Sequence, residues 1–382
     1  MKKELLVLGL GTVALLLIGV VSGVLNQSAN QFAVADPKIN LKSVRSVDQN
    51  LSPAPSPQLR YQIVDLGTFP QFWPTQSIEP KSINNVGEVV GIVKPWSIEG
   101  NARPFKWENG TLSLLSIPSQ FDPIWYSVFV EDNNNSDQSV GWALPYPYNP
   151  SASYPGFFWS DENPEVFEDV WWNGLDDNTR FLVGTRSGHQ GLSQGVIYDL
   201  DNSTFTDIGF LENGYYSVGK EVNTSGQVAC TSYDAISGLP KACLWSNGVL
   251  TDIGTLGGSV AESQDINNFG HIVGWSTNTD GLERAFLWRN GVMENLGSIS
   301  PDSYQSHAYG INDRDEVVGS SEGTAWLWRN GTLFNLSLFI PPNSEWLWLN
   351  SAQAINNRGQ IIGRGILASG QQRAFLMTPI TP

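Results

Sequence analysis

The stretch Ile266-Asn267-Asn268-Phe269-Gly270-His271-Ile272-Val273-Gly274 decides the fold, because variants of it recur along the whole chain. The clearest copies read INNVGEVVG (83–91), INDRDEVVG (311–319) and INNRGQIIG (355–363). Including weaker copies, the phrase ends at residues 91, 141, 184, 230, 274, 319 and 363. A period near 45 residues is typical of repeat architectures, and a propeller blade of four short strands has this length. The sequence therefore predicts seven similar blades.

Each repeat contains the turn signals of a four-stranded sheet. In the clearest unit, Asn267 to Gly270 form a tight turn, since Asn caps its own turn and Gly adopts positive φ. The apolar strand 284–288 follows, and Asn290-Gly291 then predicts a type I′ hairpin. Helical periodicity is not visible after residue 60. We expect an all-β fold, a seven-bladed β-propeller of four-stranded blades.

The two ends of the repeat array are complementary. The seventh unit stops after its third strand, at Arg373 to Pro379, whereas residues 61–67 match the fourth strand of other units. An N-terminal strand that joins the last blade would close the ring and cover both free edges. We therefore expect residues 60–382 to form one closed domain. A linear solenoid is the alternative, but it would need capping units.

The repeats resemble the HAF repeats of bacterial extracellular proteins. The residues that carry the resemblance are Ala285-Phe286-Leu287-Trp288, Ala374-Phe375-Leu376, Asp65 to Thr68 and Gly254 to Gly258. The resemblance covers about 320 residues and is degenerate in units two and three. It implies export and repeat structure, without an established chemistry.

The N-terminus indicates export. Lys2 and Lys3 precede an uncharged apolar run from Leu5 to Leu25, and Ala33-Val34-Ala35 resembles a signal-peptidase site. Residues 1–35 are thus a signal peptide or, since the run is long enough to span a bilayer, a membrane anchor formed by residues 5–25. Residues 36–59 are rich in Pro and Ser and predict a flexible linker. The protein is expected to be secreted or periplasmic, or else anchored.

The charge of the chain limits its partners. A net charge of −16 excludes nucleic acid as an expected partner, because phosphates require a basic patch. It also disfavours anionic membrane surfaces, so membrane contact is expected only through an uncleaved N-terminal segment. Cys230 and Cys243, the only cysteines, fall on neighbouring strands of unit four and are a candidate disulfide, with two buried thiols as the alternative. We expect a monomer.

Sequence motifs for catalysis or metal binding are sparse. His189, His271 and His307 lie in three different units, and no metal-ligand spacing is present, so we expect neither a metal nor a cofactor and identify no catalytic residue. The first strand of each unit is polar where a propeller lines its channel. The predicted channel-lining residues are Lys81, Lys220, Glu221, Gln264, Asp265 and Gln353.

Aromatic residues precede most repeats at similar positions. They fall on the face that collects the variable loops, where recognition usually occurs, and they suggest stacking on sugars or anchoring of a protein. The alternative is that they pack as core. The candidate ligand-binding residues are Trp73, Trp125, Tyr126, Trp171, Trp172, Tyr215, Tyr216, Tyr304, Trp346 and Trp348.

These features predict an exported binding module for a glycan, an envelope polymer or a protein partner, without evident catalysis. Two alternatives remain open. One is a polysaccharide hydrolase or lyase that uses carboxylates in the central channel, because pairing across blades leaves no linear signature. The other is a purely structural surface module, since propellers host many unrelated functions.

Overall fold

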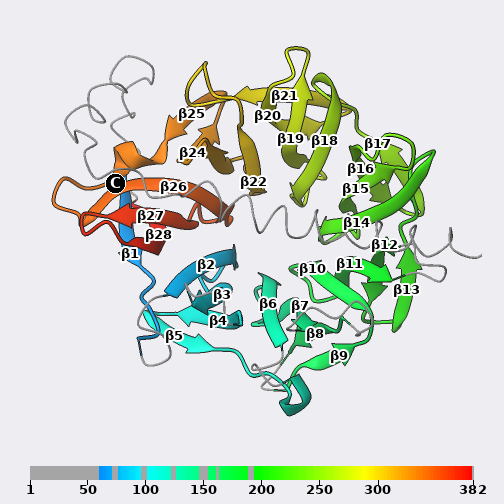
Figure 1. Cartoon of the computed structure of the whole chain (residues 1–382), viewed down its shortest axis with the longest axis horizontal. Helices are drawn as coiled ribbons and strands as arrows, with labels where there is room; N and C mark the ends of the chain where they lie inside the picture. Colours follow the sequence, from blue (N-terminus) through cyan, green and yellow to red (C-terminus); the bar gives the residue numbers. More distant parts are fainter. Residues whose placement is uncertain are drawn as a thin grey trace, which may run out of the picture. The chain divides into compact units, whose positions relative to one another are not determined.

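The computed structural model describes residues 60–70, 76–95, 101–121, 126–145, 154–160, 163–187 and 193–380. These residues form seven antiparallel sheets of four strands each. The sheets follow one another around a ring, with one strand of each sheet next to the axis (Figure 1). The prediction of an all-β, seven-bladed propeller is confirmed.

Each blade contains strands a to d, from the axis outward (Figure 1). The a strands are β2 (Gln76–Ile83), β6 (Tyr126–Asn133), β10 (Val170–Leu175), β14 (Gly214–Val222), β18 (Gly257–Ile266), β22 (His307–Ile311) and β26 (Trp346–Ile355). The b strands are β3 (Val89–Pro95), β7 (Ser139–Pro145), β11 (Phe181–Ser187), β15 (Val228–Asp234), β19 (Ile272–Asn278), β23 (Val317–Ser321) and β27 (Ile361–Leu367).

The outer strands complete the blades. The c strands are β4 (Arg103–Glu108), β8 (Gly156–Trp159), β12 (Ser193–Asp199), β16 (Pro240–Ser246), β20 (Glu283–Arg289), β24 (Thr324–Arg329) and β28 (Gln372–Pro379). The d strands are β5 (Thr111–Leu114), β9 (Glu165–Phe167), β13 (Thr204–Asp207), β17 (Val249–Asp252), β21 (Val292–Gly297), β25 (Thr332–Asn335) and β1 (Tyr61–Asp65). Two short 3₁₀ turns, η2 (Ser119–Phe121) and η3 (Leu336–Phe339), lie in d–a connections.

The glycine that ends each clear repeat lies where strands a and b approach closely. A Cβ atom at Gly274 would overlap the carbonyl oxygen of Glu262 on β18. On the other side, Gly274 is the register partner of Phe286, a fully buried ring on β20. The same pairing joins Gly363 to Phe375 in the last blade. The repeat therefore requires glycine because an aromatic ring and a neighbouring backbone occupy the space of a side chain.

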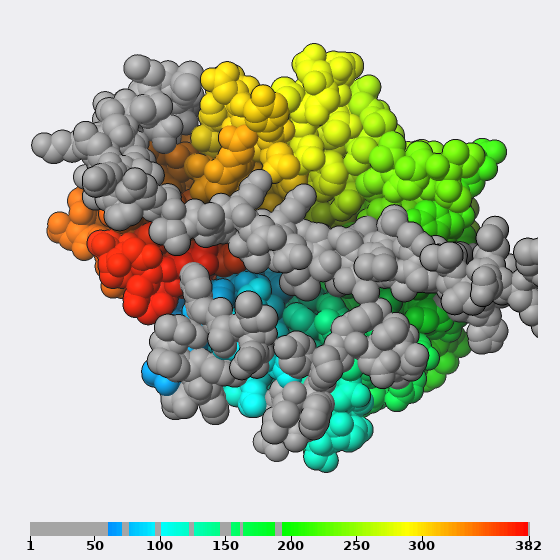
Figure 2. Space-filling view, viewed as in Figure 1, coloured from blue at the N-terminus to red at the C-terminus, as the bar shows by residue number. Residues whose placement is uncertain are grey.

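The ring closes as predicted. β1 pairs antiparallel with β28, from Tyr61 opposite Pro379 to Asp65 opposite Phe375. The Leu66 N–H continues this edge by donating to the Ala374 carbonyl at 3.0 Å. On the surface, atoms of the red C-terminal blade adjoin blue atoms from the first strands (Figure 2). The N-terminal strand therefore completes the last blade.

A chain of side-chain amides joins the a–b turns of neighbouring blades. We call the residues at this position, which is the first Asn of most repeats, the asparagine belt: Asn84, Asn134, Asp176, Asn223, Asn267, Asn312 and Asn356. The Asn267 Nδ2 donates to the Asn312 carbonyl at 3.1 Å, and the Asn312 Nδ2 donates to the Asn356 carbonyl at 3.0 Å. The Asn356 Nδ2 donates to the Asn84 carbonyl at 2.8 Å, across the closure. The belt thus connects the last repeat to the first.

Two further sequence predictions concern the N-terminal segment and the two cysteines. The run 5–25, the A-x-A site and the linker 36–59 lie outside the described residues, and no helix among the described residues is long and apolar enough to cross a membrane. Cys230 and Cys243 are direct register partners on β15 and β16, as expected. Both are buried free thiols in this structure, so the disulfide stays a prediction.

We predict that an internal deletion of residues 61–65 destabilises the whole ring. Tyr61 is 5% exposed and packs edge-on against Phe339, and β28 would lose its outer partner. The deletion should lower the melting temperature and promote self-association through the free β28 edge. A deletion of residues 53–57, which precede the domain, serves as the control. Equal melting curves for the two deletions would contradict closure by β1.

Candidate functional site

Every a strand carries a β-bulge at the same position. The register shifts by one residue in each blade, for example between Ser263 and Asp265 in β18 and between Ala308 and Gly310 in β22. A bulge changes the direction of the side chain that it contains. We call the seven residues in these bulges the bulge ring: Lys81, Glu131, Asn173, Lys220, Gln264, Tyr309 and Gln353.

All seven members of the bulge ring line one cavity of about 350 Å³ on the propeller axis. We call it the channel cavity. All six residues predicted to line the channel, namely Lys81, Lys220, Glu221, Gln264, Asp265 and Gln353, contribute to its wall. The prediction missed Glu131, Asp132, Asn173 and Tyr309, although all four also carry polar groups in the first strand of a unit. Aligning every unit on its a–b turn would have found them.

Three carboxyl groups occupy the position that follows the bulge. The Asp132 side chain accepts hydrogen bonds from the Ser82 hydroxyl at 2.5 Å and from the Leu175 N–H, in the next blade, at 3.0 Å. The Asp265 side chain accepts from the Ile311 N–H of its next blade at 2.8 Å. These two carboxyls therefore join neighbouring blades. We call Asp132, Glu221 and Asp265 the inner carboxyls.

Glu221 accepts fewer hydrogen bonds than the other two inner carboxyls. Its carboxylate accepts from the backbone N–H of the adjacent Val222 at 2.9 Å, and no other described residue donates to it. It lies against Gly174 of the preceding blade, where a Cβ atom would overlap the carboxylate oxygen. A glycine at that position gives the longer Glu side chain its space.

Burial makes the inner carboxyls weak acids. It raises the pKa of Asp132 to about 6 and that of Asp265 to about 7, against the opposing effect of their hydrogen bonds. Burial also raises the pKa of Glu221 well above its usual range, and the charges of Asp132 and Asp265 raise it further. Loss of solvation and mutual repulsion both favour the neutral form of a carboxyl group. The cavity wall therefore holds carboxyl groups that exchange protons near neutral pH.

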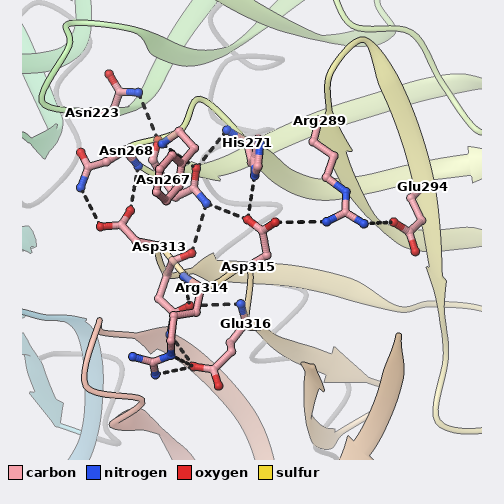
Figure 3. A network of polar contacts seen from close by, with 12 residues as sticks. Asn223, Asn267, Asn268, His271, Arg289, Glu294, Asp313, Arg314, Asp315 and Glu316 are labelled. Atoms are coloured by element: carbon pink, nitrogen blue, oxygen red, sulfur yellow. Dashed lines mark hydrogen bonds and ion pairs between the residues drawn. The ribbon is translucent and has the colours of Figure 1, made fainter. Parts of the chain in front are cut away.

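The second residue of each a–b turn forms a ring at one end of the cavity. We call it the axial ring: Asn85, Asn135, Asp177, Thr224, Asn268, Asp313 and Asn357. Asp313 Oδ2 accepts from the Asn268 Nδ2 at 3.0 Å (Figure 3). It also accepts from the Asn357 Nδ2 at 2.8 Å, so it joins three blades. Asp177 accepts from the amides of Asn135 and Asn85, at 2.8 and 3.4 Å. Burial raises the pKa of Asp177, and the charge of Asp313 adds to this effect.

Some side chains of the bulge ring form hydrogen bonds or ion pairs, and others form none with a described residue. Lys81 and Glu131 form an ion pair at 2.7 Å, and the Trp142 indole N–H donates to Glu131 at 3.2 Å. In contrast, no hydrogen bond or ion pair joins the side chain of Lys220 or Gln264 to another residue in the part of the chain that the structure describes. These two neighbours, on β14 and β18, have their full bonding capacity available.

The two histidines among the described residues are each paired with a carboxylate. His307 Nε2 lies 2.6 Å from Glu283, and its ring stacks on Trp275 with centroids 5.0 Å apart. His271 Nδ1 lies 2.7 Å from Asp315, which also binds Arg289 (Figure 3). His189 lies outside the described residues. Across the described ranges, no group of three or more His, Cys, Asp or Glu side chains is placed to hold a metal ion.

The candidate aromatic residues do not form one exposed surface. Trp172 is fully buried and Trp346 is 5% exposed, with its ring edge-on to Phe375, so both are core residues. This corrects the prediction that they contact a ligand, and the alternative of core packing holds for them.

The remaining aromatic candidates divide into three groups. Tyr304 is 73% exposed and Trp348 is 38% exposed, so both are available at the surface. Trp73 and Trp125 lie outside the described residues. The half-buried group, in which Tyr126 packs on Phe121 and Tyr216 on Tyr233, comprises Tyr126, Trp171, Tyr215 and Tyr216.

Comparison with known proteins supports the fold. The chain matches no model of a protein family and no curated protein, so the resemblance to HAF repeats stays a prediction. It is similar in structure to an oligogalacturonate lyase from Vibrio parahaemolyticus, with a TM-score of 0.52 and 9% identity over 84% of this chain and 97% of that one. A structure of oligogalacturonate lyase in complex with manganese gives a TM-score of 0.50 and 10% identity over 86% of this chain and 99% of that one.

A prolyl endopeptidase structure is also similar, with a TM-score of 0.51 and 12% identity. The match takes in 81% of this chain and 48% of the endopeptidase, so this chain spans about half the length of that protein. At such low identities the likeness shows the propeller fold alone.

We predict that Trp346→Ala costs roughly 3 to 5 kcal/mol of unfolding free energy, as expected of a buried aromatic residue. Tyr304→Ala removes an exposed ring of similar class and should cost no more than about 0.5 kcal/mol. Denaturant titration of both variants provides the measurement. Equal, small losses would show that Trp346 is not part of the core.

We predict that stability falls as the pH rises from about 4 to about 7. The folded pKa values of Asp132 and Asp265, about 6 and about 7, exceed the unfolded value of roughly 3.9, so the folded state binds more protons in this window. Asp265→Asn should flatten the dependence, whereas Asp280→Asn, at an exposed loop position, should not. Melting temperatures between pH 4.5 and 8 test this, and identical slopes for the two variants would contradict it.

Proposed function

We propose that this protein is an exported binding module whose propeller takes a small polar ligand, or the end of a glycan, in the channel cavity. The observation that carries the proposal is the bulge ring, because seven blades direct seven polar side chains into one cavity. A volume of about 350 Å³ lies within the range of roughly 300 to 1,000 Å³ for small-molecule sites.

The wall chemistry favours a ligand rich in hydroxyl groups. Amide, carboxyl and phenol groups each accept or donate hydrogen bonds to hydroxyls, and the wall offers all three through Gln264, Gln353, Asp265 and Tyr309. The apolar wall residues Ile266 and Ile311 are the last residues of the a strands β18 and β22. A glycan end matches this surface better than an apolar ligand does.

Export is part of the proposal because the sequence supports it in two ways. The positively charged start and the apolar run 5–25 are typical of a signal peptide or an anchor. The resemblance to HAF repeats implies the same location. The acidic net charge of −16 is compatible with a soluble exported domain.

A second candidate function is cleavage of a polysaccharide by hydrolysis or elimination in the same cavity. The observation that favours it is the pKa of Asp265, about 7, because a general acid or base acts best when its pKa is near the working pH. However, Asp265 and Asp132 also bond the backbone of the next blade, which explains their burial without catalysis.

We predict that the purified full-length chain binds a subset of a glycan array and that Gln264→Ala abolishes this binding. Gln264 makes no side-chain bond within the described residues, so its loss should leave the melting temperature unchanged. The paired variants Tyr304→Ala and Trp348→Ala test the exposed aromatic residues instead. Loss of binding in these two, with Gln264→Ala unaffected, would move the site out of the channel.

The same incubations distinguish binding from cleavage. Chromatography of the glycans after incubation should return them intact if the protein is a binding module. New reducing ends or unsaturated ends that disappear with Asp265→Asn would establish the enzyme instead. Absence of binding to every glycan and of any product would contradict both candidate functions.

A further inference from the structure

The side chains of the axial ring, at one end of the channel cavity, bond to one another. Asn135 Oδ1 accepts from the Asn85 N–H at 2.7 Å, and Asn85 Oδ1 accepts from the Asn357 N–H at 2.7 Å. Asn357 Oδ1 accepts from the Asp313 N–H at 2.8 Å, and Asp313 Oδ1 accepts from the Asn268 N–H at 2.9 Å. Each of these bonds joins the a–b turns of two neighbouring blades.

Two further members extend this network to all seven blades. Asp177 accepts from the Asn135 Nδ2 at 2.8 Å, and Asn268 Oδ1 accepts from the Thr224 hydroxyl at 2.8 Å. Six of the seven neighbouring pairs are therefore bonded. The exception among these described residues is the pair from the third and fourth blades, Asp177 and Thr224.

One bond crosses the interior of the axial ring. Asn85 Nδ2 donates to Asp177 at 3.4 Å, although the two residues come from the first and third blades. A bond between blades that are not neighbours is a chord of the ring, so it passes inside the circle of a–b turns. The ring is therefore narrow and is partly filled by its own side chains.

The asparagine side chains of the axial ring are fully engaged. In each of them Oδ1 accepts a backbone N–H of a neighbouring blade and Nδ2 donates to a carboxylate of the ring, and they are Asn85, Asn135, Asn268 and Asn357. A side chain that swung aside would leave a backbone N–H without its acceptor, which folded proteins avoid. The ring is therefore held shut by the same bonds that join the turns.

We infer that the axial ring seals one end of the channel, so that the cavity has a single entrance and takes the terminal unit of a glycan chain but no internal segment. This inference rests on the proposed binding function and specifies its ligand. Solvent reaches the bulge ring, where 32% of the Lys81 side chain is exposed, and the entrance lies on that side. An internal segment would need an exit for the rest of its chain, and a cavity of about 350 Å³ is too small for a chain to turn back.

The number of protein molecules bound per glycan chain tests this inference. The probes are four soluble linear polysaccharides, namely pullulan, amylose, alginate and hyaluronan, each intact and after partial hydrolysis to short chains. Sedimentation of each probe with the purified full-length protein gives the stoichiometry of the complex. We expect one protein molecule per chain for every polymer that binds, whatever its length, because each chain has a single end of each kind.

The face through which the ligand enters is tested by covering each face with a large protein. Phe269, 68% exposed, follows Asn268 in an a–b turn, whereas Leu347, 37% exposed, lies at the start of the a strand β26 and so at the opposite face. The variants Phe269→Cys and Leu347→Cys are coupled to biotin, since the native thiols Cys230 and Cys243 are buried. Streptavidin should abolish binding of the short chains by the Leu347→Cys variant and leave binding by the Phe269→Cys variant unchanged.

The other outcomes separate the inference from the proposed function. Several protein molecules on each intact chain would overturn end recognition and leave glycan binding in place. Loss of binding when streptavidin covers the Phe269→Cys variant would show that the ligand enters past the axial ring. Binding that survives streptavidin on the Leu347→Cys variant would place the ligand outside the channel. Absence of binding to every preparation, by a protein that melts cooperatively, would contradict the proposed function itself.

Discussion

The polar side chain at the start of each a–b turn, an amide in every blade except the third, is the interaction on which the rest of this structure depends. In the first blade, Asn84 Oδ1 accepts the N–H groups of Val86, Gly87 and Glu88 and so holds its own turn. Its Nδ2 donates to the Asn134 carbonyl at 2.8 Å and so holds the next blade. One buried side chain, 3% exposed, thus makes the hydrogen bonds that hold its own turn and the hydrogen bond that joins it to the next blade. An unpaired buried amide would cost about 1 to 3 kcal/mol, so each position is strongly specified.

The asparagine belt also explains why the cavity lies where it does. Belt side chains join every neighbouring pair of turns except those of the third and fourth blades, where Asp176 has no amide to donate. The bulge that precedes each turn falls at the same position in each blade, and the residue in that bulge lies on the cavity wall. The belt residues must be able to form the hydrogen bonds that hold the turn. The bulge residue has no such requirement and is Lys, Glu, Asn, Gln or Tyr in the different blades. Binding chemistry therefore varies within a fixed frame, which is how loops on rigid scaffolds usually carry function. Here a bulge takes the place of a loop.

The fold could be predicted from sequence because its signals are local and repeated. Asn-Gly hairpins such as Asn290-Gly291, with φ of 52° and 79°, require their residue types whatever the surroundings. The split repeat likewise predicted the pairing of β1 with β28, since an unpaired edge is unfavourable. The site was less predictable, because a bulge shifts the side-chain alternation by one residue and leaves no signal in composition. Glu131 and Asn173 were missed because units two and three are degenerate, which hides that these residues lie at the same distance from the a–b turn as Lys220 and Gln264.

The prediction that Trp346 contacts a ligand was wrong for a different reason. Trp346 and Trp348 are two positions apart on β26, yet one is core and the other is 38% exposed. A register shift between them breaks the two-residue period that would have placed them on one face. The alternation of side chains along a strand predicts which of them are buried only where the pairing with the neighbouring strand is regular.

The inner carboxyls show how side chains on the cavity wall also serve the architecture. Asp132 and Asp265 each tie an a strand to the next blade through a backbone N–H, and each uses its other oxygen to accept a second hydrogen bond, from the Ser82 hydroxyl or from the Ile266 N–H. A carboxyl group there raises the electrostatic cost of folding, as the elevated pKa values indicate. A side-chain amide has a single acceptor oxygen, so an Asn in place of Asp265 would set its NH2 group against one of the two backbone N–H groups. The hydrogen bonds within and between blades therefore favour a carboxyl group at this position in spite of its electrostatic cost.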